Sequence, residues 1–335
     1  MAETLIRAFD VHGMGIEVRS DWPEVDEAVA SEFGWYERPS RDVRLRVEIL
    51  QRSPDLGRFG PRRASFVTPR NVVYASRDVS IVDYFGRAVT VLDRAAGVAS
   101  VEGDDPELVR EATRHLLLAS IGEHLDSIGL PRLHALAVSR NGRALALLLP
   151  AGGGKTQLAL QALADDDVRL VADDMPLLDA SGQIRAFPVV GISVNPTDAH
   201  KLPGGEVRVT ERMEFHARSV LTIPSIAGRI DPGPTPLRHL VIGRRTLADA
   251  PAVEPASRRA AARALIRQCV VGVDLYQGME FLFRHGLVDA AGRVGTVAMR
   301  AHRCALVLRG AAAWTIELGR DDEANWAALR GILDR

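Results

Sequence analysis

The sequence predicts an α/β fold in which a mixed sheet carries a glycine-rich loop and follows a smaller α+β region. Three observations lead to this prediction. Short β-rich runs separated by turn residues occupy the first third of the chain. A strand, a glycine-rich loop and a helix follow one another at 143–164, and an apolar strand at 168–172 ends in two aspartates. We expect a boundary near residue 129, which separates an N-terminal α+β region of unknown role (1–129) from a nucleotide-binding catalytic domain (130–335).

Composition narrows the class of protein. With 335 residues, 47% of them hydrophobic, and a net charge of −1, the chain can bury a full core and offers no general positive field for nucleic acid. No apolar run is long enough to span a membrane, and the N-terminus lacks the pattern of a secretory signal. The two cysteines, Cys269 and Cys304, have no metal-ligand spacing and are expected to be buried thiols. We therefore expect a soluble, cytoplasmic protein, with self-association into a homo-oligomer left open.

The elements outside the central stretch follow from periodicity and turn residues. The first third predicts a small antiparallel sheet from strands at 43–50, 64–67, 71–75, 79–85 and 88–92. Asp105 and Pro106 predict the start of a helix that ends at Gly129. Farther on we expect a strand pair within 184–194, a helix at 257–270, a hairpin of 304–309 with 314–318, and a closing helix at 321–333.

A β-hairpin precedes the glycine-rich loop. Residues 135–139 and 143–149 read as strands, and Asn141-Gly142 between them is a typical two-residue hairpin turn. If these two residues form the turn, the register places His134 opposite Leu149, at the start of the loop. A histidine beside carboxylates and a phosphate site is suited to act as a general base, although a lone histidine at a strand start is often structural.

The glycine-rich loop is the strongest signal of chemistry. It reads Gly152-Gly153-Gly154-Lys155-Thr156-Gln157, and Lys155 is one of only two lysines against forty arginines. Glycines leave backbone N–H groups free to face phosphates, a lysine reaches the terminal phosphates of a nucleotide, and a Thr hydroxyl binds Mg²⁺. Leu149 stands where the usual pattern has its first glycine. The alternative is a glycine-rich turn before an ordinary helix.

Two adjacent acids follow the next strand. Because a strand, a helix and a strand of this length predict a right-handed parallel crossover, the carboxyl ends of both strands should meet at one sheet edge. Asp173 and Asp174 should therefore lie beside the glycine-rich loop, where a carboxylate can hold Mg²⁺ or orient a base. The positions of the two acids do not show which would hold Mg²⁺ and which would orient the base. The simpler alternative is that both are solvated surface residues.

These residues together resemble the HPr kinase/phosphorylase family, whose catalytic domain is related to PEP carboxykinase. The resemblance rests on LHALAVSRNGRALALLLPAGGGKTQLALQAL followed by RLVADD, and it covers about 130–330. It implies a HPr-kinase/PEP-carboxykinase-like mixed sheet, ATP or another NTP and Mg²⁺ as ligands, and phosphate binding by residues 152–157. It also implies that His134 and Asp174 act together as the general base, and that Thr156 and Asp173 bind the metal.

One part of the family pattern is missing. The later acid-Arg-Gly-Leu-Gly run is replaced by Phe187-Pro188-Val189-Val190-Gly191-Ile192, so the resemblance does not extend to phosphorolysis. The chain looks more like divergent relatives that modify peptides. We expect an ATP-dependent kinase that acts on a hydroxyl, such as Ser or Thr of a peptide or protein. Hydrolysis of the NTP by water and a nucleotide-binding scaffold without turnover are the alternatives. Lys201 and the arginines at 258, 259, 263 and 267 are weaker candidates for contact with anions, and a solvated surface is the simpler reading of each.

Overall fold

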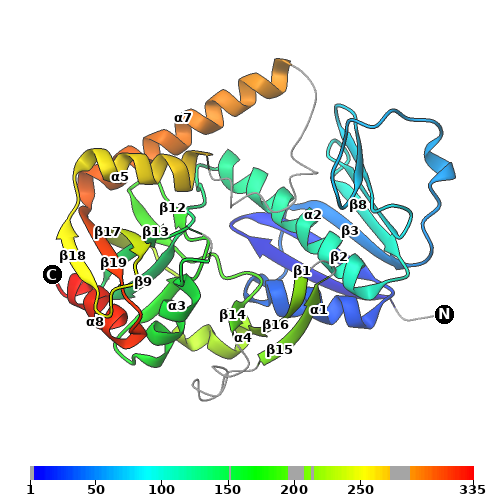
Figure 1. The fold of residues 1–335 in the computed structure, drawn as a ribbon. Helices are drawn as coiled ribbons and strands as arrows, with labels where there is room; N and C mark the ends of the chain where they lie inside the picture. The colour runs from blue at the N-terminus through cyan, green and yellow to red at the C-terminus, as the bar shows by residue number, and fades with distance from the viewer. Residues whose placement is uncertain (1–3, 151, 195–206, 213–214, 272–286) are drawn as a thin grey trace. The chain divides into compact units, whose positions relative to one another are not determined.

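The computed structural model describes residues 4–150, 152–194, 207–212, 215–271 and 287–335, which form a mixed α/β fold (Figure 1). Contacts divide the chain into two compact units. The first contains residues up to His124 with two later segments, and the second contains most of the chain from Leu125 onward. Among the described residues, no helix is long and apolar enough to cross a membrane.

The first unit contains a mixed sheet that is larger than the sequence predicts. In spatial order its strands are β1 (Leu5–Val11), β2 (Met14–Ser20), β3 (Val43–Gln51), β8 (Val98–Gly103), β7 (Ala88–Asp93), β6 (Val79–Asp83), β5 (Val72–Ala75) and β4 (Phe66–Val67). Strand β3 runs parallel to both of its neighbours, β2 and β8. The predicted antiparallel pairing is confirmed for the strands β4 to β7. It was wrong for the strand at 43–50, because the helix α1 (Pro23–Phe33) connects β2 to β3 and permits a parallel pair.

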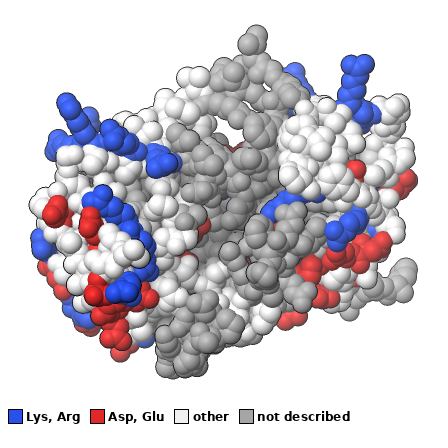
Figure 2. Space-filling model, in the orientation of Figure 1, with Lys and Arg blue, Asp and Glu red and all other residues white. Residues whose placement is uncertain are grey.

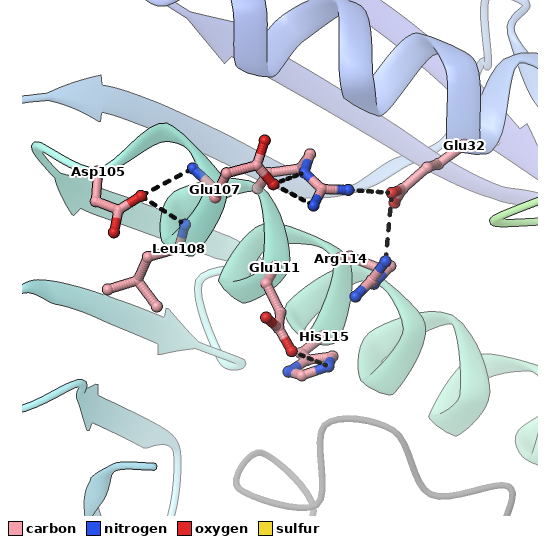
Figure 3. A network of polar contacts seen from close by, with 8 residues as sticks. Glu32, Asp105, Glu107, Leu108, Glu111, Arg114 and His115 are labelled. Carbon is pink, nitrogen blue, oxygen red and sulfur yellow. Dashed lines mark hydrogen bonds and ion pairs between the residues drawn. The ribbon is translucent and has the colours of Figure 1, made fainter. Parts of the chain in front are cut away.

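The helix α2 (Pro106–Ser127) begins where the sequence predicts. Its cap is Asp105, whose carboxylate accepts hydrogen bonds from the N–H groups of Glu107 at 3.1 Å and Leu108 at 3.3 Å (Figure 3). A side-chain acceptor at this position satisfies donors that the first helical turn leaves without partners. Gly129 follows the helix with a φ of 76°, a left-handed conformation that ends helices.

A buried ion cluster joins α1 to α2 in the first unit. Glu32 of α1 lies 3.4 Å from Arg110 and 3.5 Å from Arg114, and Figure 3 shows the Glu32 carboxylate facing α2. All three side chains are at most one-tenth exposed. A buried charge that loses its partner is costly, so this cluster specifies how α1 packs on α2.

The second unit contains the candidate site and a second mixed sheet. Its strands follow the order β11 (Arg169–Ala172), β9 (Leu136–Arg140), β10 (Arg143–Leu148), β17 (Thr235–Arg245), β13 (Gln183–Arg185) and β12 (Leu177–Leu178), and β19 (Ala312–Leu318) pairs with both β17 and β18 (Ala252–Pro255). Both β10 and β11 are antiparallel to β9, so β10 and β11 run in the same direction. The sequence predicts this shared direction, but it does not reveal that β9 lies between the two strands.

The helices of the second unit flank this sheet. They are α3 (Lys155–Ala164), α4 (Ile223–Ile226), α5 (Arg258–Leu265), α7 (Leu287–Gly310) and α8 (Asp322–Leu333). Helices α3 and α8 pack against each other and against the strands (Figure 1). A π-helical turn at Ile266–Val271 follows α5, so the α-helix predicted for 257–270 ends earlier than expected.

Two sequence predictions for this unit were wrong. Residues 304–309 belong to α7 and not to a hairpin strand, since Arg300, Cys304 and Val307 are buried at the spacing of one helical face. A short apolar run does not by itself distinguish a buried strand from a buried helix. The strand pair predicted within 184–194 also fails, because β13 and β14 (Ile192–Val194) lie in different sheets, the latter with β16 (Phe215–Leu221) and β15 (Val207–Arg212).

Candidate functional site

The β9–β10 hairpin has the register that the sequence predicts. Asn141 and Gly142 have φ angles of 50° and 71°, which suit a two-residue hairpin turn that matches the twist of the strands. Arg140 pairs with Arg143, and the ladder continues to Leu136 with Leu147. Continued two residues farther, the same register places His134 beside Leu149. The His134 side chain and the Leu149 carbonyl both contact the ammonium group of Lys155.

The glycine-rich loop ends at the start of α3. Gly154, the residue before the helix, has a φ of 97°, and Gly152 has a φ of 73°. Only glycine adopts this left-handed region without strain, which explains two of the three glycines. The helix begins at Lys155, so the N–H groups of its first turn face back toward the loop. A helix start of this kind attracts anions.

The two aspartates lie beside this helix start. They follow β11, whose carboxyl end is at the same sheet edge as that of β10 because the strands share a direction. The Thr156 hydroxyl donates to Asp173 Oδ2 at 3.1 Å, which joins the first turn of α3 to the acid pair. The structure thus brings together the loop, Thr156 and both acids, as the crossover predicts.

His134, Lys155 and Asp174 form a compact cluster. The Lys155 Nζ lies 2.6 Å from His134 Nε2 and donates to the Leu149 carbonyl at 3.0 Å. The Asp174 Oδ1 lies 3.0 Å from His134 Nε2 and 3.7 Å from Lys155 Nζ. His134 and Lys155 are only 2% and 8% exposed, whereas the Asp174 side chain is 44% exposed. Solvent and small molecules therefore reach this cluster from the Asp174 side.

Backbone hydrogen bonds hold His134 in place. Its N–H donates to the Gln268 carbonyl at 3.0 Å, and the N–H of the next residue, Ala135, donates to the Asp174 carbonyl at 3.1 Å. Gln268 belongs to the π-helical turn after α5. Sequence reasoning missed this contact because a backbone carbonyl leaves no signature in residue type.

The two aspartates have opposite electrostatic behaviour. Burial raises the pKa of Asp173 to about 7, and the neighbouring charge of Asp174 acts in the same direction. Burial alone would also raise the pKa of Asp174, but its contacts with His134 and Lys155 outweigh this and lower the pKa. Adjacent acids whose environments push their pKa values apart are typical of sites that divide work between two carboxylates.

Asp173 and Thr156 are the residues at this site that could hold a magnesium ion together with phosphates. Among the described residues, Asp173 Oδ1 is buried and has no hydrogen-bond partner. No cluster of three or more His, Cys, Asp or Glu side chains in that part of the chain could hold a metal alone. Mg²⁺ does not need such a cluster, because it binds through one or two carboxylates together with substrate phosphates and water. Asp173 and Thr156 would supply its protein oxygens.

The raised pKa of Asp173 predicts how stability depends on pH. The unfolded chain loses this proton near pH 4, whereas the folded protein keeps it up to about pH 7. The stability that this group contributes is therefore complete below about pH 4 and is lost as the pH rises to about 7. We expect Asp173→Asn to stabilise the metal-free protein at pH 8 by about 1–2 kcal/mol, a figure reduced for partial exposure, and by much less at pH 5.

Urea unfolding at pH 5 and pH 8 measures this effect. Asp174→Asn is the matched control, because a lowered pKa contributes stability at neutral pH that is lost on acidification. This variant should be destabilised at pH 8, opposite in sign to Asp173→Asn. Equal effects of the two substitutions at pH 8 would contradict the assignment of the buried proton to Asp173.

The remaining sequence candidates are Lys201 and the arginines at 258, 259, 263 and 267. Lys201 lies outside the described residues. The arginines of α5 and its π-helical extension are exposed, and Figure 2 shows Lys and Arg side chains gathered over α5 at the upper left. These arginines fit the solvated surface that the sequence suggests.

Arg245, which contacts the glycine-rich loop, was not predicted from the sequence. Arg245, at the end of β17, donates from Nε to the Gly153 carbonyl at 3.1 Å. Nothing in the sequence marks one arginine among forty, although the parallel pairing of β17 with β10 places the ends of both strands together.

The chain matches no protein-family model and no curated protein.

Proposed function

We propose that this protein is an ATP-dependent kinase with a HPr-kinase-like catalytic domain, and that it transfers the γ-phosphoryl group to a hydroxyl of Ser or Thr in a peptide or protein. The observation that carries the proposal is the cluster of His134, Asp174 and Lys155 at the start of α3. It joins a base, a carboxylate and a phosphate-binding cation at one glycine-rich helix start. A site for anion binding alone needs no base.

The contacts of Lys155 support a base role for His134. The Lys155 ammonium only donates hydrogen bonds, so in the form of the imidazole in which Nε2 carries no proton, this nitrogen would accept from Lys155. The same nitrogen lies 3.0 Å from Asp174 Oδ1. A proton that Nε2 takes from an acceptor hydroxyl would therefore be stabilised at once by the carboxylate, which is the arrangement that general-base catalysis requires.

The other residues would bind and orient the nucleotide. The N–H groups at the start of α3 and the Lys155 ammonium would hold its phosphates, as in other enzymes of phosphoryl transfer. Mg²⁺, bound at Thr156 and Asp173, would neutralise charge on these phosphates. The acceptor hydroxyl would approach His134 from the side of Asp174, whose side chain is 44% exposed.

Incubation with γ-³²P-labelled ATP and a panel of Ser- and Thr-containing peptides tests the proposal. We expect label in a peptide, with loss of label in the His134→Ala variant. Label only in free phosphate would instead indicate an NTPase with water as acceptor. Binding of ATP without its consumption would indicate a scaffold, and either of these results would overturn the kinase assignment.

A further inference from the structure

Arg245 connects the glycine-rich loop to two other segments of the second unit. Its guanidinium donates to the Gly153 carbonyl at 3.1 Å, to the Gly319 carbonyl at 2.8 Å and to Asp322 Oδ1 at 3.1 Å. These partners lie in the loop, at the end of β19 and at the start of α8. One planar guanidinium thus donates to three acceptors at once. The single ammonium of a lysine, on its flexible side chain, does not reproduce this arrangement.

The contact with Gly153 determines how the following peptide group is oriented. In a planar trans peptide, the carbonyl of one residue and the N–H of the next point in opposite directions. Since Arg245 holds the Gly153 carbonyl, the Gly154 N–H points away from the guanidinium. No hydrogen bond joins this N–H to another residue that the structure describes, whereas the Gly153 N–H already donates to the Pro150 carbonyl at 3.0 Å.

Glycine makes this orientation easy to lose. A peptide between two glycines rotates with little steric resistance, because glycine occupies both signs of φ. Arg245 also fills the space beside Gly154, since a Cβ built there would lie 2.4 Å from Arg245 Nη2. The residue that packs against the loop is therefore also the one that holds its peptide plane.

We propose that Arg245 is a positioning residue, which keeps the Gly153–Gly154 peptide oriented so that the Gly154 N–H faces the phosphates of the nucleotide. It acts through the loop and does not itself bind the phosphates. This inference rests on the proposed function only in naming the nucleotide as the anion. The orientation of the peptide plane stands on the hydrogen bonds of Arg245 alone.

Two measurements on the full chain test the role of Arg245. Hydrogen–deuterium exchange of the segment 152–160 without ligand reports on the order of the loop, and titration with ATP and with inorganic pyrophosphate reports on anion binding. In Arg245→Ala we expect faster exchange of the loop and roughly 10- to 100-fold weaker binding of both anions, as befits loss of a charge-assisted hydrogen bond. Arg245→Lys should restore less than half of this loss on a logarithmic scale.

Arg244→Ala is the matched control. Arg244 is the preceding residue, its side chain is 71% exposed, and it pairs with Glu317 away from the loop. Its removal deletes the same charge and should change neither measurement by more than about twofold, because exposed ion pairs contribute little. Should Arg245→Ala fail to fold, Asp322→Asn tests the same anchor, and it should speed loop exchange while weakening ATP binding.

The outcomes separate this inference from the proposed kinase. Unchanged loop exchange together with unchanged ATP binding in Arg245→Ala would overturn the positioning role. Full binding by Arg245→Lys would also overturn it, because charge near the phosphates would then suffice. Failure of the unaltered protein to bind ATP would count against the kinase, while the exchange experiment would still decide whether Arg245 orders the loop.

Discussion

Lys155→Ala is expected to weaken nucleotide binding severely, with a loss of affinity of about 30- to 150-fold. In the proposed complex the Lys155 ammonium would meet the terminal phosphates of the nucleotide, and in the structure it is 8% exposed among Leu149, His134 and Asp174. A charge-assisted contact in such a buried place is worth about 2–3 kcal/mol, and the loop N–H groups lose the counter-charge that draws phosphate to them. Titration with a fluorescent ATP analogue measures the loss.

The composition of the chain suggests a sharper variant. Lys155→Arg keeps the charge, yet a planar guanidinium does not fit the space that the compact ammonium occupies between His134 and Leu149. We expect this variant to bind nucleotide nearly as poorly as Lys155→Ala. Lys201→Arg, at the only other lysine, is the control and should bind normally. ATP binding by Lys155→Ala with unaltered affinity would refute the phosphate-binding loop.

His134→Ala is expected to reduce phosphoryl transfer by about 10²–10⁴-fold while the affinity for ATP stays within a fewfold. The imidazole contacts Lys155 and Asp174 but belongs to no element of the glycine-rich loop. Loss of a base therefore lowers kcat, and loss of a binding contact would raise KM. Steady-state kinetics with the peptide that accepts label in the transfer assay separates the two effects.

Asp174→Asn provides the test of partnership in the same assay. Residues that act as one unit give losses that do not add, so the double variant should transfer hardly more slowly than His134→Ala alone. Independent, additive losses would mean that Asp174 acts elsewhere in the reaction. If His134→Ala transfers the phosphoryl group as fast as the unaltered protein, His134 is not the general base.

The sequence predicts the candidate cluster better than it predicts the sheets. The Asn141-Gly142 turn specifies a register, and the register alone places His134 beside Leu149. Parallel direction of β10 and β11 then brings the acids to the loop. Both inferences depend on local backbone rules, which act within a few residues of the motif.

The parts that sequence reasoning misses depend on long-range pairing. Strand β9 lies between β10 and β11, and β3 runs parallel to both of its neighbours, because of packing partners that are distant in sequence. The run from Cys304 belongs to the helix α7, whose buried Arg300 pairs with Asp126, a residue of α2 that is distant in sequence. Arg245 and the Gln268 carbonyl act through hydrogen bonds that any arginine and any residue could offer.

The contact between Lys155 and His134 couples activation of the base to nucleotide binding. While the ammonium donates to Nε2, the lone pair that would deprotonate the acceptor is occupied. Phosphates that attract Lys155 would release that lone pair, so a peptide bound before ATP meets a histidine that is not yet able to react. The base would then become competent only when nucleotide is bound, whichever substrate binds first.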